Sequence, residues 1–134
     1  MYIKGLVTRD GDWWVAEIPA FCIGTQGRDD DEARTMLASA VHDILPDLEF
    51  EILWTHRDSG EIALKTGDVA AALGFIIKQN RAGTEQSLRD IASAMGANYP
   101  NAVAVYEKGA SEASISKLDA ILGAMGKRLI VTVE

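Results

Sequence analysis

The stretch from residue 13 to residue 45 constrains the fold of this chain more than any other. Two short runs, 13–18 and 22–26, have the composition of β-strands, and Gly27 leads from the second run into an amphipathic helix. The apolar residues of that helix recur at three- and four-residue steps: Ala33, Met36, Leu37, Ala40, Val41 and Ile44. One stripe of the helix is therefore expected to face a core that the sheet supplies.

The beginning of this helix carries a strong local signal. Asp29 is placed to cap the first turn, and Glu32 stands three residues later, as in a capping box. Asp30 and Asp31 add negative charge at the positive end of the helix dipole. Pro46 cannot continue the helix and is expected to end it.

Further strands are predicted on both sides of this stretch, at residues 2–8, 49–55 and 61–65. The order is then three strands, one helix and two strands, which indicates an α+β unit. The brief polar segment 66–68 is the expected boundary between this unit and the rest of the chain. We therefore predict a first domain over residues 1–66 and a second over residues 67–134.

The sequence WWVAEIPAFCIGTQGRDDDEARTMLASAVHDIL resembles the HicB family of antitoxins. The similarity lies in a hairpin that ends in the turn 18–22, a short strand, and the glycine-led start of an acidic helix at 27–33. The resemblance implies a partial ribonuclease H-like domain, with a small antiparallel sheet and one helix, that is not an enzyme. It also implies a partner, a small basic HicA-like mRNA-cleaving toxin, which the antitoxin blocks sterically.

Charge is distributed unevenly along the chain. Residues 1–67 carry 13 acidic and 6 basic side chains, whereas residues 68–134 carry 7 of each, so the net charge of −7 belongs to the first half. An acidic surface suits a basic protein partner and opposes nucleic acid, although a solvated acidic face that aids solubility is an equal alternative. The predicted toxin contacts are Asp29, Asp30, Asp31 and Glu32, together with residues of an edge strand.

The sequence pattern of the second half predicts a series of short helices. Helical segments are predicted at 69–81, 87–95, 101–108 and 114–125, with glycines between them. The sequence SLRDIASAMGANYPNAVAVYEKG resembles the lambda-repressor-like (XRE) helix-turn-helix. This resemblance implies an all-α helix-turn-helix domain that binds promoter or operator DNA as a homodimer and represses its own operon.

The expected recognition helix lacks arginine, so its DNA contacts are predicted at its ends. Asn98, Tyr99 and Asn101 are the candidates for bases, and Arg89 and Lys108 for phosphates. Further candidates for phosphate contacts are Lys78, Arg81 and Lys117. The alternative is a domain that serves dimerisation or packing alone.

The C-terminal segment is rich in β-branched residues and is predicted to be a strand. An unpaired strand edge invites another chain, so the expected dimerisation residues are Leu129, Ile130, Val131, Thr132 and Val133. The alternative is that this strand returns to the sheet of the first domain.

Other chemistries find little support. The two histidines and the single cysteine are too far apart in sequence for a zinc site, and no cofactor motif is present. The longest apolar run has nine residues, where a membrane span needs about 20; the single cysteine suits a reducing cytoplasm. The expected function is an autoregulating antitoxin in the cytoplasm, and the alternative is an orphan, perhaps phage-derived, DNA-binding regulator without a toxin.

Overall fold

The computed structural model describes residues 1–97 and 99–134. The chain divides into two compact units, Met1–Asp68 and Val69–Glu134. The division falls two residues after the boundary expected from the sequence.

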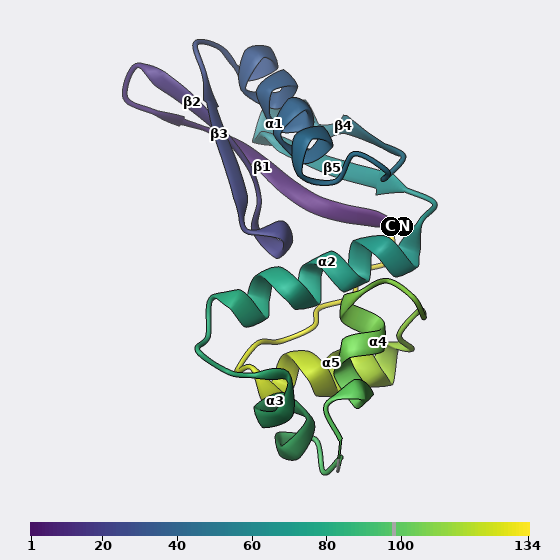
Figure 1. The fold of residues 1–134 in the computed structure, drawn as a ribbon. Coiled ribbons are helices and arrows are strands. Elements are labelled where there is room, and N and C mark those ends of the chain that lie inside the picture. Colours follow the sequence, from purple (N-terminus) through teal and green to yellow (C-terminus); the bar gives the residue numbers. More distant parts are fainter. Residues whose placement is uncertain (98) are drawn as a thin grey trace. The chain divides into compact units, whose positions relative to one another are not determined.

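The first unit is built on a five-stranded antiparallel sheet (Figure 1). Its strands, in chain order, are β1 Tyr2–Asp10, β2 Trp13–Ile18, β3 Ile23–Gly27, β4 Phe50–His56 and β5 Glu61–Thr66. They are arranged in the order β3-β2-β1-β5-β4, which makes β3 and β4 the two edge strands. Gly11, between β1 and β2, and Gly60, between β4 and β5, both adopt positive φ, which glycine accommodates without strain.

Helix α1, Asp30–Ile44, covers one face of this sheet (Figure 1). Asp29 caps it, with its side chain accepting a hydrogen bond from the Glu32 N–H at 2.7 Å. The buried stripe of α1 consists of Ala33, Leu37 and Val41. Burying a side chain such as Leu37 stabilises the unit by about 1.5–3 kcal/mol. The predicted helix and its Asp29 cap are confirmed, whereas Met36 and Ile44, which were predicted to lie on the buried stripe, are 47% and 48% exposed.

Strand register decides which sheet residues meet α1. Val7 pairs with Ala16, and Ala16 pairs with Thr25, so these residues share the helix-facing side of the sheet. The Thr25 hydroxyl donates to the Ala33 carbonyl at 3.0 Å, which ties β3 to the first turn of α1. Gly27 is required at the junction, because a Cβ there would lie 2.3 Å from the backbone nitrogen of Ala33.

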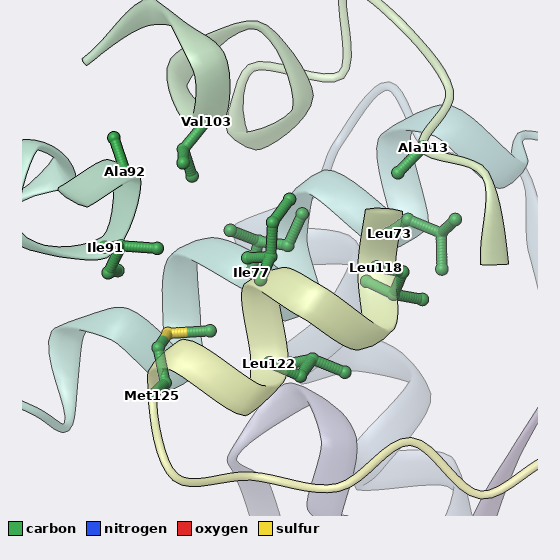
Figure 2. Packing of buried hydrophobic residues seen from close by; sticks show 10 residues of the cluster. Leu73, Ile77, Ile91, Ala92, Val103, Ala113, Leu118, Leu122 and Met125 are labelled. Atoms are coloured by element: carbon green, nitrogen blue, oxygen red, sulfur yellow. The ribbon is translucent and has the colours of Figure 1, made fainter. Parts of the chain in front are cut away.

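The described residues of the second unit, 69–97 and 99–134, form four helices around one apolar core. They are α2 Val69–Ala82, α3 Leu88–Ala94, α4 Asn101–Glu107 and α5 Ile115–Ala124. Figure 2 shows the buried side chains that these helices direct toward one another. The core is formed by Leu73, Ile77, Ile91, Ala92, Val103, Ala113, Leu118, Ile121, Leu122 and Met125.

Helices α2 and α4 approach closely in this unit. A Cβ on Gly74 would lie 2.6 Å from the Tyr106 carbonyl oxygen, so only glycine allows the contact. Near it, Arg81 donates two hydrogen bonds of 2.8 Å to the carboxylate of Glu107. The hydrogen bond to Glu107 raises the pKa of Arg81 and outweighs the partial burial of the pair, which acts in the opposite direction. Arg81 is therefore engaged inside the unit and is not the free phosphate contact predicted from the sequence.

The fold class predicted from the sequence is wrong. The described residues form an α+β fold in which the strands come first, with one five-stranded antiparallel sheet and five α-helices. This is not a small ribonuclease H-like sheet followed by an all-α helix-turn-helix domain that ends in a strand. Residues 127–134 belong to no strand, since β-branched composition favours a strand only where another strand is available to pair with it.

A candidate protein-binding groove beside the edge strand

One stripe of α1 runs alongside the edge strand β4. Asp31, Arg34, Ala38 and His42 are three or four residues apart and therefore lie on the same side of the helix. The first two residues of this stripe contact β4 directly, whereas the last two face it across a hollow. We call this boundary between α1 and β4 the seam, with a closed end at Asp31 and an open end at His42.

Long polar side chains fill the closed end. The indole Nε1 of Trp54 donates to Asp31 Oδ1 at 3.2 Å, and Arg57 Nη2 donates to Asp31 Oδ2 at 2.9 Å. The guanidinium of Arg57 also lies 5.0 Å from the centroid of the Trp54 ring, within cation–π range. The hydrogen bonds from Arg57 and then from Trp54 lower the pKa of Asp31, and the bond to Asp31 raises the pKa of Arg57.

Arg34 crosses the middle of the seam. Its Nη1 donates to the Ile52 carbonyl oxygen of β4 at 2.8 Å. Its Nε lies 3.8 Å from Asp31 Oδ1, which is an ion-pair distance without a hydrogen bond. The helix and the edge strand are thus joined by a charged side chain that satisfies a backbone carbonyl of the strand.

Short side chains leave the open end hollow. A groove of about 560 Å³ lies there, with Ala38 and Ser39 of α1 on one side and Phe50 and Ile52 of β4 on the other. The remaining lining residues are His42, Leu48, Glu49 and Glu51. Both glutamates are exposed, whereas Leu48 and Ile52 are buried. The groove therefore has an apolar floor and an acidic margin, which are features of a protein-binding site.

A second hollow, of about 340 Å³, lies beyond the closed end, between β1 and the turn after β4. Arg9 and Arg57 are among its lining residues, but Arg9 donates to the Gly11 carbonyl and Arg57 to Asp30 and Asp31. Its arginines are engaged with the protein itself, so we regard the open groove as the stronger candidate.

The structure brings the four predicted toxin contacts together in the first turn of α1. Asp29 caps the helix, and Glu32 accepts the backbone N–H of Arg28 at 3.0 Å. Asp30 and Asp31 accept hydrogen bonds from Arg57. Each of the four carboxylates thus has an intramolecular partner, and their role in binding a toxin stays a prediction.

The predicted DNA contacts are only partly brought together. Tyr99 precedes α4 and Asn101 begins it, and both are exposed. Lys108 lies at the other end of α4, about 10 Å away along the axis, and Arg89 is exposed on α3. Asn98 lies outside the described residues. DNA binding by these residues stays a prediction.

The predicted dimerisation residues differ in their surroundings. Leu129 is half-buried against the helical core. Ile130, Val131 and Val133 are 77%, 61% and 96% exposed, and Thr132 is exposed as well. The predicted strand is not formed in this chain, although its apolar side chains remain accessible.

The groove residues were not singled out from the sequence. Ala38 and Ser39 read only as part of an amphipathic helix, and Phe50 and Ile52 as the inward side of a strand. One signal was available: His42 and the pair Ala38-Ser39 interrupt the large apolar residues on that helix. Small residues on a helix beside an edge strand are the pattern that leaves a hollow.

In residues 1–97 and 99–134, no group of three or more His, Cys, Asp or Glu side chains is arranged to hold a metal ion. None of the helices in the described part of the chain is both long and apolar enough to cross a membrane. Compared with known proteins, the sequence matches no family model and no curated protein. The HicB and helix-turn-helix relationships are thus resemblances only, and the function has to be inferred from the charges and contacts of the chain itself.

Proposed function

We propose that the first unit binds a small basic protein and thereby blocks its activity sterically, as the resemblance to HicB antitoxins implies. The observation that carries the proposal is the separation of charge between the units. Residues 1–68 hold 14 acidic and 6 basic side chains, a net charge of −8, whereas residues 69–134 hold 6 acidic and 7 basic ones. The excess is thus concentrated on one compact unit.

The basic side chains of the first unit offset only part of its acidic charge, which leaves the net charge of −8. Arg57 and Lys4 form ion pairs with carboxylates, and Arg34 is held against the Ile52 carbonyl. These basic groups are engaged within the unit, and the carboxylates in excess of the basic side chains give the surface of the unit a negative potential. Such a surface speeds association with a basic protein and repels the phosphates of nucleic acid. A HicA-like mRNA-cleaving toxin is the kind of partner that the resemblance suggests.

Repression through the second unit is not part of the proposal. Affinity for DNA depends on neutralising phosphates with several free basic side chains. This unit has a net charge of only +1, and Arg81 is engaged with Glu107. No observation on the described residues of the second unit therefore favours operator binding over packing.

The test begins with a short basic reading frame beside the gene for this protein. Its product should arrest growth and degrade mRNA when expressed alone, and co-expression of this protein should restore growth. The two purified proteins should form a complex that weakens as salt rises, because the attraction is between charged surfaces. A frame whose product neither arrests growth nor binds would overturn the proposal, and salt-sensitive binding to its own promoter would then favour an orphan regulator.

A further inference from the structure

We propose that the partner's docking element is a basic amphipathic helix seated in the open groove between α1 and β4, and not a strand added to β4. The inference rests on the proposed function, because it specifies which part of a basic protein partner meets the acidic unit. Three features support it: the hydrogen bonds of β4, the side chains that line the groove and the charges at its margin.

The free edge of β4 is already partly occupied. An edge strand offers unpaired N–H and C=O groups on every second residue, and a partner strand usually binds them. The carbonyl of Ile52 points away from β5 and accepts a hydrogen bond from Arg34 at 2.8 Å. By alternation, Phe50 and Trp54 direct their backbone groups to the same side. A strand added here would have to displace Arg34 from the centre of the edge.

The closed end obstructs strand addition as well. The indole of Trp54 is hydrogen-bonded to Asp31, and Arg57 is paired with the same carboxylate. The helix and the strand are thus linked across the last part of the edge. The region that remains accessible lies beside Phe50, where the groove is open. Of the three residues whose backbone groups face outward, Ile52 and Trp54 are linked to α1, and only Phe50 is not. A partner is therefore expected to reach this region with side chains and not with a backbone strand.

The lining of the groove suits a helix. Ala38 and Ser39 keep the wall formed by α1 low, while Phe50, Ile52 and Leu48 supply apolar contact area on the other side. Small residues on one helix allow a second helix to pack at the usual interaxial distance of about 8–10 Å. Anchoring side chains spaced at i, i+3 or i+4 and i+7 would then enter the hollow from one helix face.

The charges at the margin decide the chemistry of that helix. Glu49 and Glu51 line the groove and are exposed. Glu51 alternates with Phe50 and Ile52 along β4, so its carboxylate is directed to the other face of the strand, and its charge adds to the net charge of −8 of the unit rather than to the groove itself. The C-terminal end of α1, with its partial negative charge, lies at the same end of the seam as the groove. A helix with lysine or arginine flanking its apolar stripe complements these groups, whereas an acidic helix would be repelled.

The test uses a peptide of leucine and lysine, about five helical turns long, with leucines at i, i+3, i+4 and i+7, and a scrambled peptide of the same composition. We expect the amphipathic peptide to bind the ¹⁵N-labelled full-length chain at least about tenfold more tightly. Its chemical-shift changes should centre on the amides of residues 38–42 and 48–52. Equal binding of both peptides, or changes centred on the first turn of α1, would overturn the inference.

Two matched pairs of variants locate the binding. Ser39→Trp fills the groove and should abolish the preference for the amphipathic peptide, whereas Met36→Trp, on the same helix outside the groove, should leave it unchanged. The double variant Glu49→Gln/Glu51→Gln should weaken binding of the amphipathic peptide about tenfold. Its control, Asp10→Asn/Asp12→Asn, removes the same charge from the β1–β2 hairpin and should weaken binding of that peptide less. Equal effects within either pair would contradict seating in the groove.

The same variants separate this inference from the proposed function. If the product of the adjacent reading frame binds the wild type and Ser39→Trp equally well, the docking mode is wrong and the function stands. If that product does not bind at all while the peptide still seats in the groove, the function is wrong and the docking mode stands.

Discussion

The two ends of the seam between α1 and β4 have the same backbone architecture and opposite character. At the closed end, Asp31, Trp54 and Arg57 reach across and bond to one another. At the open end, Ala38 and Ser39 are too short to reach β4, and a groove remains. Side-chain length along one helical stripe therefore decides where an edge strand is covered and where it is available to a partner.

Truncation of Leu37, the buried side chain that holds α1 against the sheet, should have the largest effect on the stability of the first unit. Leu37 is fully buried on the face of α1 that meets the sheet, so Leu37→Ala should destabilise the first unit by about 2–5 kcal/mol through lost contacts and a cavity. Urea denaturation followed by tryptophan fluorescence measures this unit alone, because all three tryptophans, Trp13, Trp14 and Trp54, lie in it. The control is Met36→Ala, at a site 47% exposed, which should cost much less; equal losses would refute the assignment of the buried face.

Removal of the Arg34 guanidinium from the middle of the seam should have an intermediate effect on the stability of the first unit. Arg34→Met keeps the aliphatic stem but removes the donor to the Ile52 carbonyl, and we expect a loss of about 1 kcal/mol in the free energy of unfolding. The uncovered edge of β4 should then pair with other copies of the chain. Sedimentation velocity over a range of concentrations would reveal this association.

Arg34→Lys is the matched control for this change, because it keeps the charge but not the planar donor group. It should lie between the wild type and Arg34→Met in stability and in association. A variant Arg34→Met that is as stable and as monodisperse as the wild type would show that Arg34 does not guard the edge.

The smallest expected effect concerns the pH dependence of the closed end. The pKa of Asp31 is lowered in the folded unit, so its ionised form stabilises the fold above the ordinary value of 3.8. That contribution is lost as the pH falls through the lower, folded-state pKa. The difference in urea midpoint between the wild type and Asp31→Asn should therefore be constant from about pH 7 to about pH 5, begin to shrink near about pH 4, and disappear only when the pH is below the folded-state pKa of Asp31.

Salt provides a second check on the same pair. Asp31 and Arg57 are exposed, so added NaCl should reduce the difference between the wild type and Asp31→Asn. The control Asp12→Asn, in the hairpin turn, should show no comparable difference at any pH. A difference that grew on acidification would mean that Asp31 is destabilising as a carboxylate.

Local signals in the sequence were sufficient for most of the individual elements. The cap at Asp29 and the helix that follows it are short-range features, and the structure has them where the sequence placed them, although only Ala33, Leu37 and Val41 of the predicted apolar stripe are buried. The candidate site was not predictable in the same way. Trp54 and Arg57 are 23 and 26 residues from Asp31, so their contact depends on the sheet order that places β4 beside α1.

The sequence by itself determined the helix and strand segments of the first unit and the concentration of negative charge on it, because both depend on neighbouring residues and composition. Only the tertiary structure decided that residues 127–134 are not a strand, that Arg34 covers the edge of β4, and that a groove remains beside Ala38. A strand needs a partner and a groove needs two walls, and long-range packing supplies both.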